Sequence, residues 1–526
     1  MLSLLLSLAT AQTLPAGAEV ERAASIQITT DGLNNFGTVL PGLVPESFPI
    51  DPISSEGGGS GCFGYEVDIY NLDAGIGVTG VAFNPRTGIL DLQADLLINL
   101  NDSGNPFNLD YRWCSSNECT GWVRPFPVQA DIPFQIAVET APDGTRYVDA
   151  EVGTIELDLG LTNEHIQLNG DCGGIQTLDQ ILSLANLSFY QFIIDNVEPF
   201  LLAELQSQAE DIELTIEEAL TQARYEDAVD LAGAELQVLV EPRDIDITPY
   251  GLQIDMLGRI HAEQAACIAQ HDIGGSAWTD TRVPELEDAS DDTVVHLSDD
   301  LANQGLYGVW RSGILCYEVG GDSELDIGFP INSSLLGVLG GEGFDEIIPE
   351  ERELIIRTDP RTPPTAAFDG GHDLTAQVRG LDVNFYTEVD GRQARALGIT
   401  IEADAGVDLL FDDVTGVLAA DIALGADNIR PIASHNQLVA SATADIESNF
   451  SGLLDVLLDR LVGDSLDGIA FGLPAYEGVG LASAAVGPTG DGDWLGIAAE
   501  VGEVSYSGSG CDQGCSGDAT GGCSAA

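Results

Sequence analysis

Apolar and polar residues alternate along much of this chain. The alternation is clearest over residues 76–100 and 396–424. A period of two places successive side chains on opposite faces of a strand, so that one face can be buried while the other meets water. Turn residues such as Asn84, Pro85 and Gly88 interrupt these runs. The pattern therefore predicts long antiparallel strands in both halves of the chain.

Two other segments have the three-and-four spacing of an amphipathic helix. The first opens with a Thr177/Gln180 capping box and contains Pro199, which is expected to kink or interrupt it. The second is stopped by Gly463. The apolar faces comprise Ile181, Leu184, Phe189, Phe192, Ile193, Val197, Phe200, Leu201 and Leu205 in the first helix, and Phe450, Leu453, Leu454, Leu457, Leu458, Leu461 and Val462 in the second.

A short motif occurs twice, about half the chain apart. "TDGLNNFG" at residues 30–37 aligns with "SDDLANQG" at residues 298–305, and each copy follows a β-branched run. Thr30 and Ser298 are the expected hydroxyl N-caps of short helices. Gly305 is expected to end the second helix, after which Leu306 and Val309 open a strand.

Each half closes with a strand pair around a Pro-x-Gly turn, at Pro249/Gly251 and at Pro488/Gly490. Each half therefore reads as a short helix, a curved antiparallel sheet, a long helix and a closing strand pair. A sheet with long alternating strands buries one apolar-faced helix by wrapping around it. Such a barrel has room for a ligand besides its own side chains.

The predicted organisation has five parts. Residues 1–11 form a secretory signal, in which an apolar run precedes Ala9-Thr10-Ala11. No later segment approaches the ~18 apolar residues of a membrane span, so a secreted or cell-surface protein is expected. The other parts are a barrel at 20–267, an acidic linker at 268–293, a second barrel at 294–506 and a Gly/Ser/Cys-rich tail at 507–526.

The chain of 526 residues carries a formal net charge of -68 and contains no lysine. Such a surface repels nucleic acids and anionic headgroups at long range, which argues against a nucleic-acid partner. Solvation in a salty medium explains the acidity better than specific ion binding does. Clusters that could hold calcium, for which a solvated turn is the favoured interpretation, are Glu285, Glu287, Asp288, Asp291 and Asp292, then Asp412 and Asp413, then Asp491 and Asp493.

The nine cysteines fit an oxidising compartment. Cys114 and Cys119 could close a hairpin loop, Cys267 and Cys316 bracket the central linker, and Cys62 with Cys172 is a third candidate pair. The remaining three, Cys511, Cys515 and Cys523, lie in the tail. None of these spacings is that of a zinc site.

The order of elements resembles the bactericidal/permeability-increasing protein family, which includes lipopolysaccharide-binding protein and the phospholipid and cholesteryl ester transfer proteins. "ASIQITTDGLNNFGTVL" resembles the opening of that family, "VVHLSDDLANQGLYGVWRSGIL" the start of its second half, and "TDPRTPPTAAF" with "LDVNFYTEVDG" its C-terminal strands. The resemblance implies an α+β fold. Two tubular lipid-binding barrels would be joined by a central sheet into an elongated boomerang, with no enzyme activity and no required cofactor.

Two departures from the family change what the resemblance implies. The cationic tip that recognises lipopolysaccharide is missing, because the first half has no lysine and few arginines. The family's disulfide from a strand into the first long helix has no clear counterpart, since Cys172 precedes the helix and no cysteine lies on it.

Acyl chains need an apolar slot and little else, because each buried methylene contributes about 0.8 kcal/mol. Core packing is the simpler interpretation for any single candidate. The lipid-binding candidates are Leu33, Phe36, Val39 and Leu40 with Ile181, Leu184, Phe189, Phe192 and Ile193 of the first helix, and Leu301, Leu306, Leu335, Leu336, Val338 and Leu339 with Phe450, Leu453, Leu454 and Leu457 of the second.

No catalytic constellation is visible in the sequence. The histidines His165, His261, His271, His296, His372 and His435 are scattered without metal-ligand spacing, and there is no nucleophile elbow or HExxH motif. The sequence therefore predicts a secreted, non-enzymatic lipid-binding or lipid-transfer protein with lipids as partners and transient contact with a membrane surface. The alternative is an acidic cell-surface structural or adhesion protein, calcium-dependent, with barrels filled by side chains.

Overall fold

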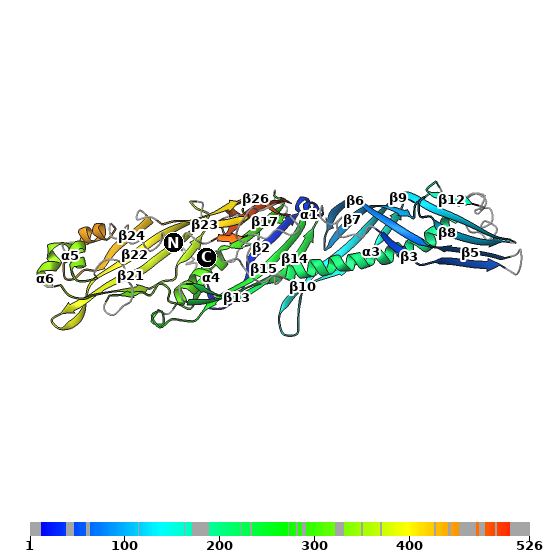
Figure 1. Ribbon diagram of the computed structural model, residues 1–526. Helices are drawn as coiled ribbons and strands as arrows, with labels where there is room; N and C mark the ends of the chain where they lie inside the picture. The colour runs from blue at the N-terminus through cyan, green and yellow to red at the C-terminus, as the bar shows by residue number, and fades with distance from the viewer. Residues whose placement is uncertain are drawn as a thin grey trace, which may run out of the picture. The chain divides into compact units, whose positions relative to one another are not determined.

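Strands dominate the computed structural model, and helices are few (Figure 1). Two compact units are distinguished. Unit 1 comprises Met1–Gln27, Ala223–Arg243 and Ile254–Ala526, and unit 2 comprises Ile28–Gln222 and Asp244–Gln253. The structure describes residues 12–37, 47–58, 64–113, 115–162, 164–170, 189–221, 224–231, 234–271, 273–279, 282–286, 291–320, 331–348, 351–368, 371–424, 428–439, 443–451, 470–472, 479–489 and 492–504.

Unit 2 is built on one antiparallel sheet in the order β3-β6-β7-β9-β8-β5-β4, and β10, β11 and β12 pair with the outer edge of β9. The strand bounds are β3 Ser47–Ile50, β4 Ile53–Gly58, β5 Gly64–Tyr70, β6 Leu72–Arg86, β7 Ile89–Leu100, β8 Phe107–Trp113, β9 Ser115–Thr140, β10 Arg146–Val152, β11 Glu156–Leu159 and β12 Ile166–Gly170.

The period of two in β7 produces the buried face of this sheet. Every second residue from Leu90 to Leu100 is buried. Its partners across the ladder are also apolar, as in the pairs Leu92 with Ile132 and Leu96 with Val128. Apolar pairs directly opposite one another stabilise a sheet and fix its register, because a one-residue slip would expose the whole row.

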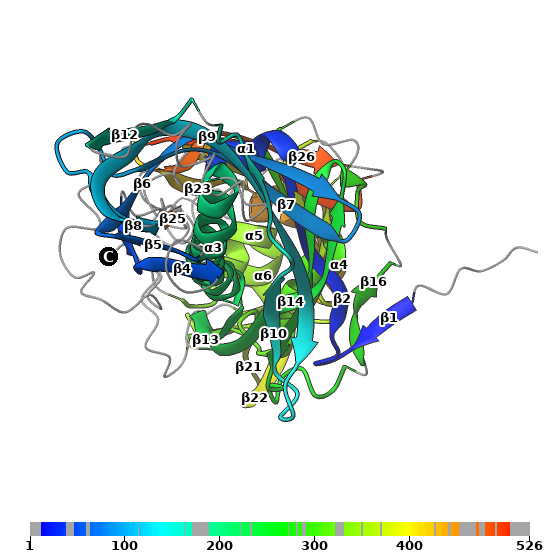
Figure 2. The same ribbon diagram turned by 90° about the vertical axis from the view of Figure 1, so that its right-hand side faces the viewer.

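The long helix of unit 2 is α3, Phe189–Thr221. The strands β9, β6, β7 and β10 curve around it (Figure 2). Its buried stripe has Val197, Leu201, Leu205 and Ala209 at a spacing of four. The expected interruption at Pro199 is wrong, because α3 continues through this residue to Thr221. Pro199 lies on the exposed side of the helix, and tertiary packing of the flanking stripe offsets the proline's cost.

A seven-stranded sheet, most of whose residues belong to unit 1, has the order β13-β14-β15-β2-β17-β27-β26. The two strands that precede the repeated motif, β2 and β17, are neighbours, and each is flanked by the closing strand pair of its own half of the sequence. The bounds are β13 Tyr225–Leu231, β14 Ala234–Thr248, β15 Gly251–Ala262, β2 Val20–Thr29, β17 Thr293–Ser298, β27 Trp494–Glu503 and β26 Val479–Thr489. Pro488 and Thr489 belong to β26 and not to a turn, which corrects the expected position of the second turn.

The repeated motif itself forms helices: α1, Thr30–Gly37, in unit 2, and the first part of α4, Asp299–Arg311, in unit 1. Ser298 is the N-cap of α4 and accepts a hydrogen bond from the N–H of Leu301, which confirms the prediction. In the first copy the hydroxyl that accepts a hydrogen bond, from the N–H of Gly32, belongs to Thr29 and not to the expected Thr30.

Helix α4 does not end at Gly305, and Leu306 and Val309 are helical, so the predicted strand there is wrong. The first left-handed residue after the helix is Gly313, with φ 82°. The glycines inside α4 serve close packing instead. A Cβ on Gly308 would lie 3.3 Å from Leu236 Cδ2 of β14, so the absence of a side chain lets the helix approach the sheet.

The second sheet of unit 1 has the order β18-β19-β21-β22-β23-β25, with β20 paired to β21 and β24 paired to β22. Two short helices, α5 Ser334–Gly340 and α6 Glu342–Ile347, pack on it together with helical residues 443–451. The strand bounds are β18 Glu318–Val319, β19 Leu354–Pro360, β20 Thr365–Ala367, β21 Leu374–Val389, β22 Arg392–Asp412, β23 Val417–Ala423, β24 Ile429–His435 and β25 Ala470–Gly472.

The segment 268–293, expected as an acidic linker, is joined to unit 1 by specific contacts. It contains β16, Gly275–Trp278, which pairs with β1, Gln12–Pro15. The carbonyl of Arg282 accepts a hydrogen bond from Trp494 Nε1, and Leu286 is buried. Backbone pairing and burial of this kind hold a segment in place.

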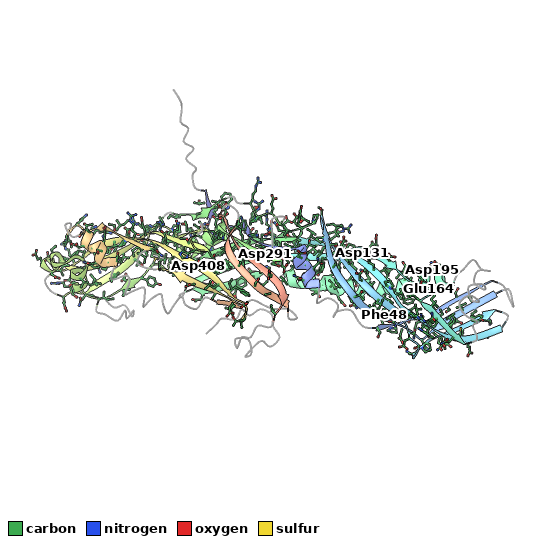
Figure 3. All side chains as sticks on the ribbon, turned by 90° about the horizontal axis from the view of Figure 1, so that it is seen from above. Phe48, Asp131, Glu164, Asp195, Asp291 and Asp408 are labelled. Atoms are coloured by element: carbon green, nitrogen blue, oxygen red, sulfur yellow. A yellow bond between two sulfur atoms is a disulfide. The ribbon has the colours of Figure 1, made fainter. Side chains whose placement is uncertain are left out.

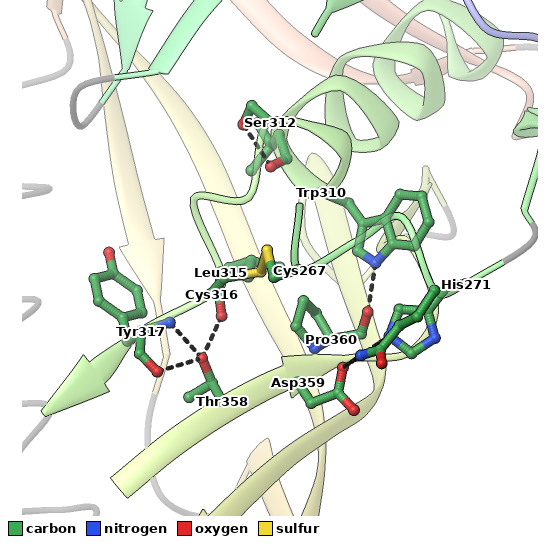
Figure 4. Close-up of a disulfide and its surroundings, with 12 residues drawn as sticks. Cys267, His271, Trp310, Ser312, Leu315, Cys316, Tyr317, Thr358, Asp359 and Pro360 are labelled. Carbon is green, nitrogen blue, oxygen red and sulfur yellow. Dashed lines mark hydrogen bonds and ion pairs between the residues drawn. A yellow bond between two sulfur atoms is a disulfide. The ribbon is translucent and has the colours of Figure 1, made fainter. Parts of the chain in front are cut away.

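Cys267 and Cys316 form the disulfide that the sequence suggested (Figure 4). Beside the disulfide, Trp310 Nε1 donates a hydrogen bond to the carbonyl of Pro360. The Nε2 atom of His271 lies 2.7 Å from Asp359 Oδ1. Cys119 is also disulfide-bonded. Its predicted partner Cys114, and both members of the predicted pair Cys62 and Cys172, lie outside the described residues. Predictions for residues 1–11, for the tail and for Gly463 likewise lie outside the described residues.

Candidate functional site

A groove of about 640 Å³ lies in unit 2, between the end of β10 and the middle of α3. The end of β10 and the loop after it contribute one charged residue and four uncharged ones. Helix α3 contributes two apolar residues and one amide. The loop side consists of Glu151, Val152, Gly153, Thr154 and Ile155. The helix side consists of Leu202, Ala203 and Gln206.

The loop wall is fixed against β9. The N–H of Gly153 donates a hydrogen bond to the carbonyl of Pro133 over 2.8 Å. A Cβ on Gly153 would lie 3.0 Å from the ring of Pro133, so glycine allows this close approach. Ile155, two residues on, is 7% exposed and anchors the loop in the apolar core. The wall is therefore held by backbone bonding on one side and by burial on the other.

The helix wall is positioned by the neighbouring buried stripe. Leu201 is 1% exposed and Leu205 is 4% exposed. Residues one position along the chain lie about 100° around a helix, so Leu202 and Gln206 share the adjacent row. Packing of the stripe on the sheet thus turns this row, and Ala203 beside it, toward the end of β10.

Hydrogen bonds join the helix to the edge of β10 next to the groove. Glu217 Oε1 accepts from the N–H of Ala150 at 3.0 Å, and Glu213 Oε2 accepts from the N–H of Val152 at 3.1 Å. These carboxylates satisfy backbone donors that an edge strand otherwise leaves to solvent. These bonds therefore hold the helix and the strand together beside the groove.

The surroundings of the groove are acidic. Burial raises the pKa of Asp149 on β10, and the nearby carboxylates of Glu139, Glu217 and Glu151 raise it further. Tyr147 donates a hydrogen bond to Glu139 over 3.0 Å, and this bond raises the pKa of the tyrosine hydroxyl. Acidic side chains continue along unit 2, where Asp131, Glu164 and Asp195 are labelled (Figure 3).

Apolar walls with a polar margin suit a ligand that is mostly hydrocarbon. Among the described residues, no group of three or more His, Cys, Asp or Glu side chains could hold a metal ion. Of the eight described lining residues, Val152, Ile155, Leu202 and Ala203 offer apolar surface, and Glu151, Thr154 and Gln206 offer polar groups. The arrangement allows an apolar chain to contact the walls while polar groups lie beside it.

Another hollow, of about 360 Å³, lies in unit 1 at the end of the β21–β22 hairpin. Its lining includes Glu351, Glu353 and Glu388, and Arg352 lies 3.5 Å from Glu388. Charged and polar groups dominate this hollow, so it offers little apolar surface to a ligand. The unit 2 groove is the better candidate on this ground.

The structure places few of the predicted first-half residues, and none of those it describes lines the groove. Leu33 lies in α1 and is buried. This helix packs beside β6, where Asn34 Oδ1 accepts a hydrogen bond from the N–H of Phe83. The remaining candidates are residues or side chains outside the described part of the chain: Phe36, Val39, Leu40, Ile181, Leu184, Phe189, Phe192 and Ile193.

In the second half, Leu335, Leu336, Leu339 and Phe450 lie together in one packed core. Phe450 meets Phe385 edge-on with ring centroids 6.3 Å apart, and Asn449 donates to the carbonyl of Leu339 over 3.0 Å. Val338, predicted to join them, is instead 67% exposed, because it lies on the outer side of α5. Leu453, Leu454 and Leu457 lie outside the described residues.

Leu301 and Leu306 have different surroundings from those expected. Leu301 packs with Val20 and Ala23 of the seven-stranded sheet. Leu306 is half-buried in α4, because that helix extends past Gly305. Leu301 therefore helps to hold α4 on this sheet, and the predicted second long helix beyond residue 451 lies outside the described residues.

Sequence reasoning missed the groove residues Val152, Ile155, Leu202, Ala203 and Gln206. The helical pattern did identify the buried stripe beside them, with Leu201 and Leu205. The pairing of β10 with the far end of β9 brings Val152 opposite Phe134, and this pairing is not visible in a single strand's pattern. A signal that could have helped is Gly153, a glycine that ends an alternating run.

No protein-family model matches the chain. No curated protein matches it by sequence either. Among solved structures, lipopolysaccharide binding protein matches with a TM-score of 0.54 at 14% identity, over 92% of this chain and 100% of that one. P47 of Clostridium botulinum E1 has a TM-score of 0.25 at 8% identity, over 92% and 100% of the two chains. Takeout 1 of Epiphyas postvittana has a TM-score of 0.20 at 12% identity, over 35% and 88%.

The first of these matches spans nearly the whole chain. Among the residues that the structure describes, no helix has the length and apolar character of a membrane-spanning segment. At the level of fold this match confirms the resemblance inferred from the sequence: the chain has the fold of lipopolysaccharide binding protein.

Proposed function

We propose that this chain is a secreted, non-enzymatic protein that binds lipid by its acyl chains in the unit 2 groove and carries lipid between surfaces. The observation that carries the proposal is the apolar wall formed by Val152, Ile155 and Leu202 between β10 and α3. A volume of about 640 Å³ lies within the usual range of small-ligand sites. Burying an acyl chain there is favourable by about 0.8 kcal/mol per methylene.

Two further observations support the proposal. The fold is that of lipopolysaccharide binding protein, which, as its name says, binds lipopolysaccharide. The disulfide between Cys267 and Cys316 is of a kind that persists in oxidising compartments, which supports secretion. In unit 1 the described lipid candidates Leu336, Leu339 and Phe450 are core residues, so the proposal is confined to unit 2.

The test is native mass spectrometry of the purified protein, with extraction and identification of co-purifying lipid. We expect bound lipid, or uptake of a fluorescent long-chain acyl lipid from vesicles, at one site. Ala203→Trp should fill the groove and abolish that uptake, because Ala203 is an exposed small residue in its lining.

Leu214→Trp is the matched control. Leu214 lies on the same helix, is 59% exposed and is not part of the groove lining. The control should bind lipid like the natural protein. A clean apo mass that stays unchanged after incubation with vesicles would count against the proposed function, and equal loss in both tryptophan variants would count against the groove.

A further inference from the structure

The unit 2 groove is lined on its polar side by groups that suit some headgroups and not others. Glu151 is the one charged residue among the eight described lining residues, and it is negative. Thr154 and Gln206 add an uncharged hydroxyl and an uncharged amide. An anionic headgroup at this position would lie beside the carboxylate of Glu151 with no cation in the described lining to offset the repulsion between like charges.

Backbone donors next to the groove are already used. The N–H groups of Ala150 and Val152 donate to Glu217 and Glu213, and the N–H of Gly153 donates to the carbonyl of Pro133. Phosphate and carboxylate ligands are commonly held by free backbone N–H groups or by arginine. At this edge the protein's own carboxylates occupy the places that such an anion would take.

The wider electrostatic surroundings act in the same direction. On the neighbouring part of the sheet, burial raises the pKa of Asp149, and the carboxylate of Glu139 raises it further. Unit 2 has four described arginines, and none of them lines the groove. Arg86 and Arg112 are paired with Asp91 and Glu66, while Arg124 and Arg146 lie elsewhere on the sheet. The only charge among the described lining residues is therefore negative.

We propose that the unit 2 groove selects lipids whose headgroup carries no net negative charge. This inference rests on the proposed function and specifies its ligand class. Thr154 and Gln206 would exchange hydrogen bonds with hydroxyl, ester or carbonyl groups of such a lipid, while its acyl chains lie along Leu202 and Ile155. Glu151 provides the discrimination against anionic headgroups.

The experiment uses the full chain and three probes with identical acyl chains: diacylglycerol, phosphatidylcholine and phosphatidylglycerol. Each competes with a fluorescent diacylglycerol, at low salt and at 1 M salt. We expect phosphatidylglycerol to compete at least about tenfold more weakly than the other two. At 1 M salt the Debye length is ~3 Å, so a difference that persists reports contacts in the groove and not the net charge of the protein.

A pair of charge-matched variants locates the effect. Glu151→Arg should reduce the discrimination against phosphatidylglycerol by about tenfold. Glu118→Arg makes the same change in net charge at an exposed position of β9, in the part that pairs with β8 and not with β10, and should leave discrimination unchanged. If Glu151→Arg does not fold, as judged by circular dichroism, Glu151→Gln is expected to reduce discrimination in the same direction.

The outcomes separate this inference from the proposed function. Equal competition by all three lipids, or an equal effect of the two arginine variants, would overturn charge selection while leaving lipid binding intact. Failure of every probe to bind would instead overturn the proposed function itself.

Discussion

The carboxylate of Glu217 on α3 accepts a hydrogen bond from the backbone N–H of Ala150 on β10, with 3.0 Å between Oε1 and N. Glu213, one helical turn earlier, does the same for Val152. Strand β10 pairs along its other edge with β9. Two glutamates thus take the place of a neighbouring strand, and the helix closes the sheet edge beside the groove.

Replacing both carboxylates should therefore open this edge. In Glu213→Ala/Glu217→Ala we expect amide hydrogen exchange at Ala150 and Val152 to accelerate at least about tenfold, because two donors lose their partners at about 1 kcal/mol or more each. Glu210→Ala removes an exposed carboxylate of the same helix that bonds to Gln206 and not to β10, and is the control. Unchanged exchange in the double variant would show that these bonds do not hold the edge.

The disulfide in unit 1 should make a large contribution to stability. It closes a loop with a sequence separation of 49 residues, for which loop-closure entropy predicts about 4 kcal/mol. We expect Cys267→Ser/Cys316→Ser to lower the free energy of unfolding of unit 1 by that order, measured by urea denaturation followed by tryptophan fluorescence. Trp310 lies close to the bond and reports this region (Figure 4). A loss below about 1 kcal/mol would contradict the entropic argument.

Local sequence signals predicted the elements whose cause is local. Ser298 caps α4 because a serine hydroxyl at this position satisfies a free helix N–H, whatever the rest of the fold does. The alternation in residues 89–100 predicted the buried row of β7, because only one register buries it. The stripe of Leu201 and Leu205 followed from helical periodicity in the same way.

Features set by distant contacts could not be predicted in this way. Gly305 reads as a helix end, but α4 continues because the helix packs closely on β14 and β15, where Gly308 meets Leu236. Pro199 reads as a break, but the packed stripe on either side keeps α3 continuous. The groove depends on the pairing of β10 with β9, and no property of residues 151–155 alone indicates that partner.

His296 in the seven-stranded sheet should make stability fall in acid. Burial lowers the pKa of His296 to about 4. The side chain is 4% exposed, and its ring nitrogens face Gln27 and Thr489. The pKa of His296 is 6.5 in the unfolded chain and about 4 in the folded one. Between pH 6.5 and pH 4 the unfolded chain therefore binds a proton at this residue and the folded chain does not, so the free energy of unfolding decreases as pH falls.

The expected loss from His296 is about 2 kcal/mol between pH 7 and pH 4, after allowance for solvent screening. Urea denaturation at several pH values measures it. In His296→Gln the free energy of unfolding should fall by about 2 kcal/mol less over this pH range than in the natural protein, because position 296 then has no imidazole to take up a proton. Parallel pH profiles for the two proteins would mean that His296 can take up a proton in the folded state.

Asp300 should have the opposite pH dependence. Burial raises the pKa of Asp300 to about 7, and the neighbouring charges of Asp299 and Asp493 add to the shift. Its Oδ1 accepts a hydrogen bond from the N–H of Thr279 over 2.7 Å. Because the folded pKa lies above the unfolded value of 3.8, the folded state binds the proton more tightly, and stability is lost as pH rises from about 4 through 7.

Asp300→Asn should therefore stabilise the protein at pH 8, by about 2 kcal/mol after allowance for screening, because the amide keeps the acceptor oxygen without the buried charge. At pH 4 the aspartate is largely protonated when folded, so the two proteins should have similar free energies of unfolding, and this pH is the internal control. Asp299→Asn should show a smaller effect of the same sign, since the pKa of Asp299 is raised to about 6. Destabilisation of Asp300→Asn at pH 8 would mean that the charged carboxylate contributes more through its bond to Thr279 than its burial costs.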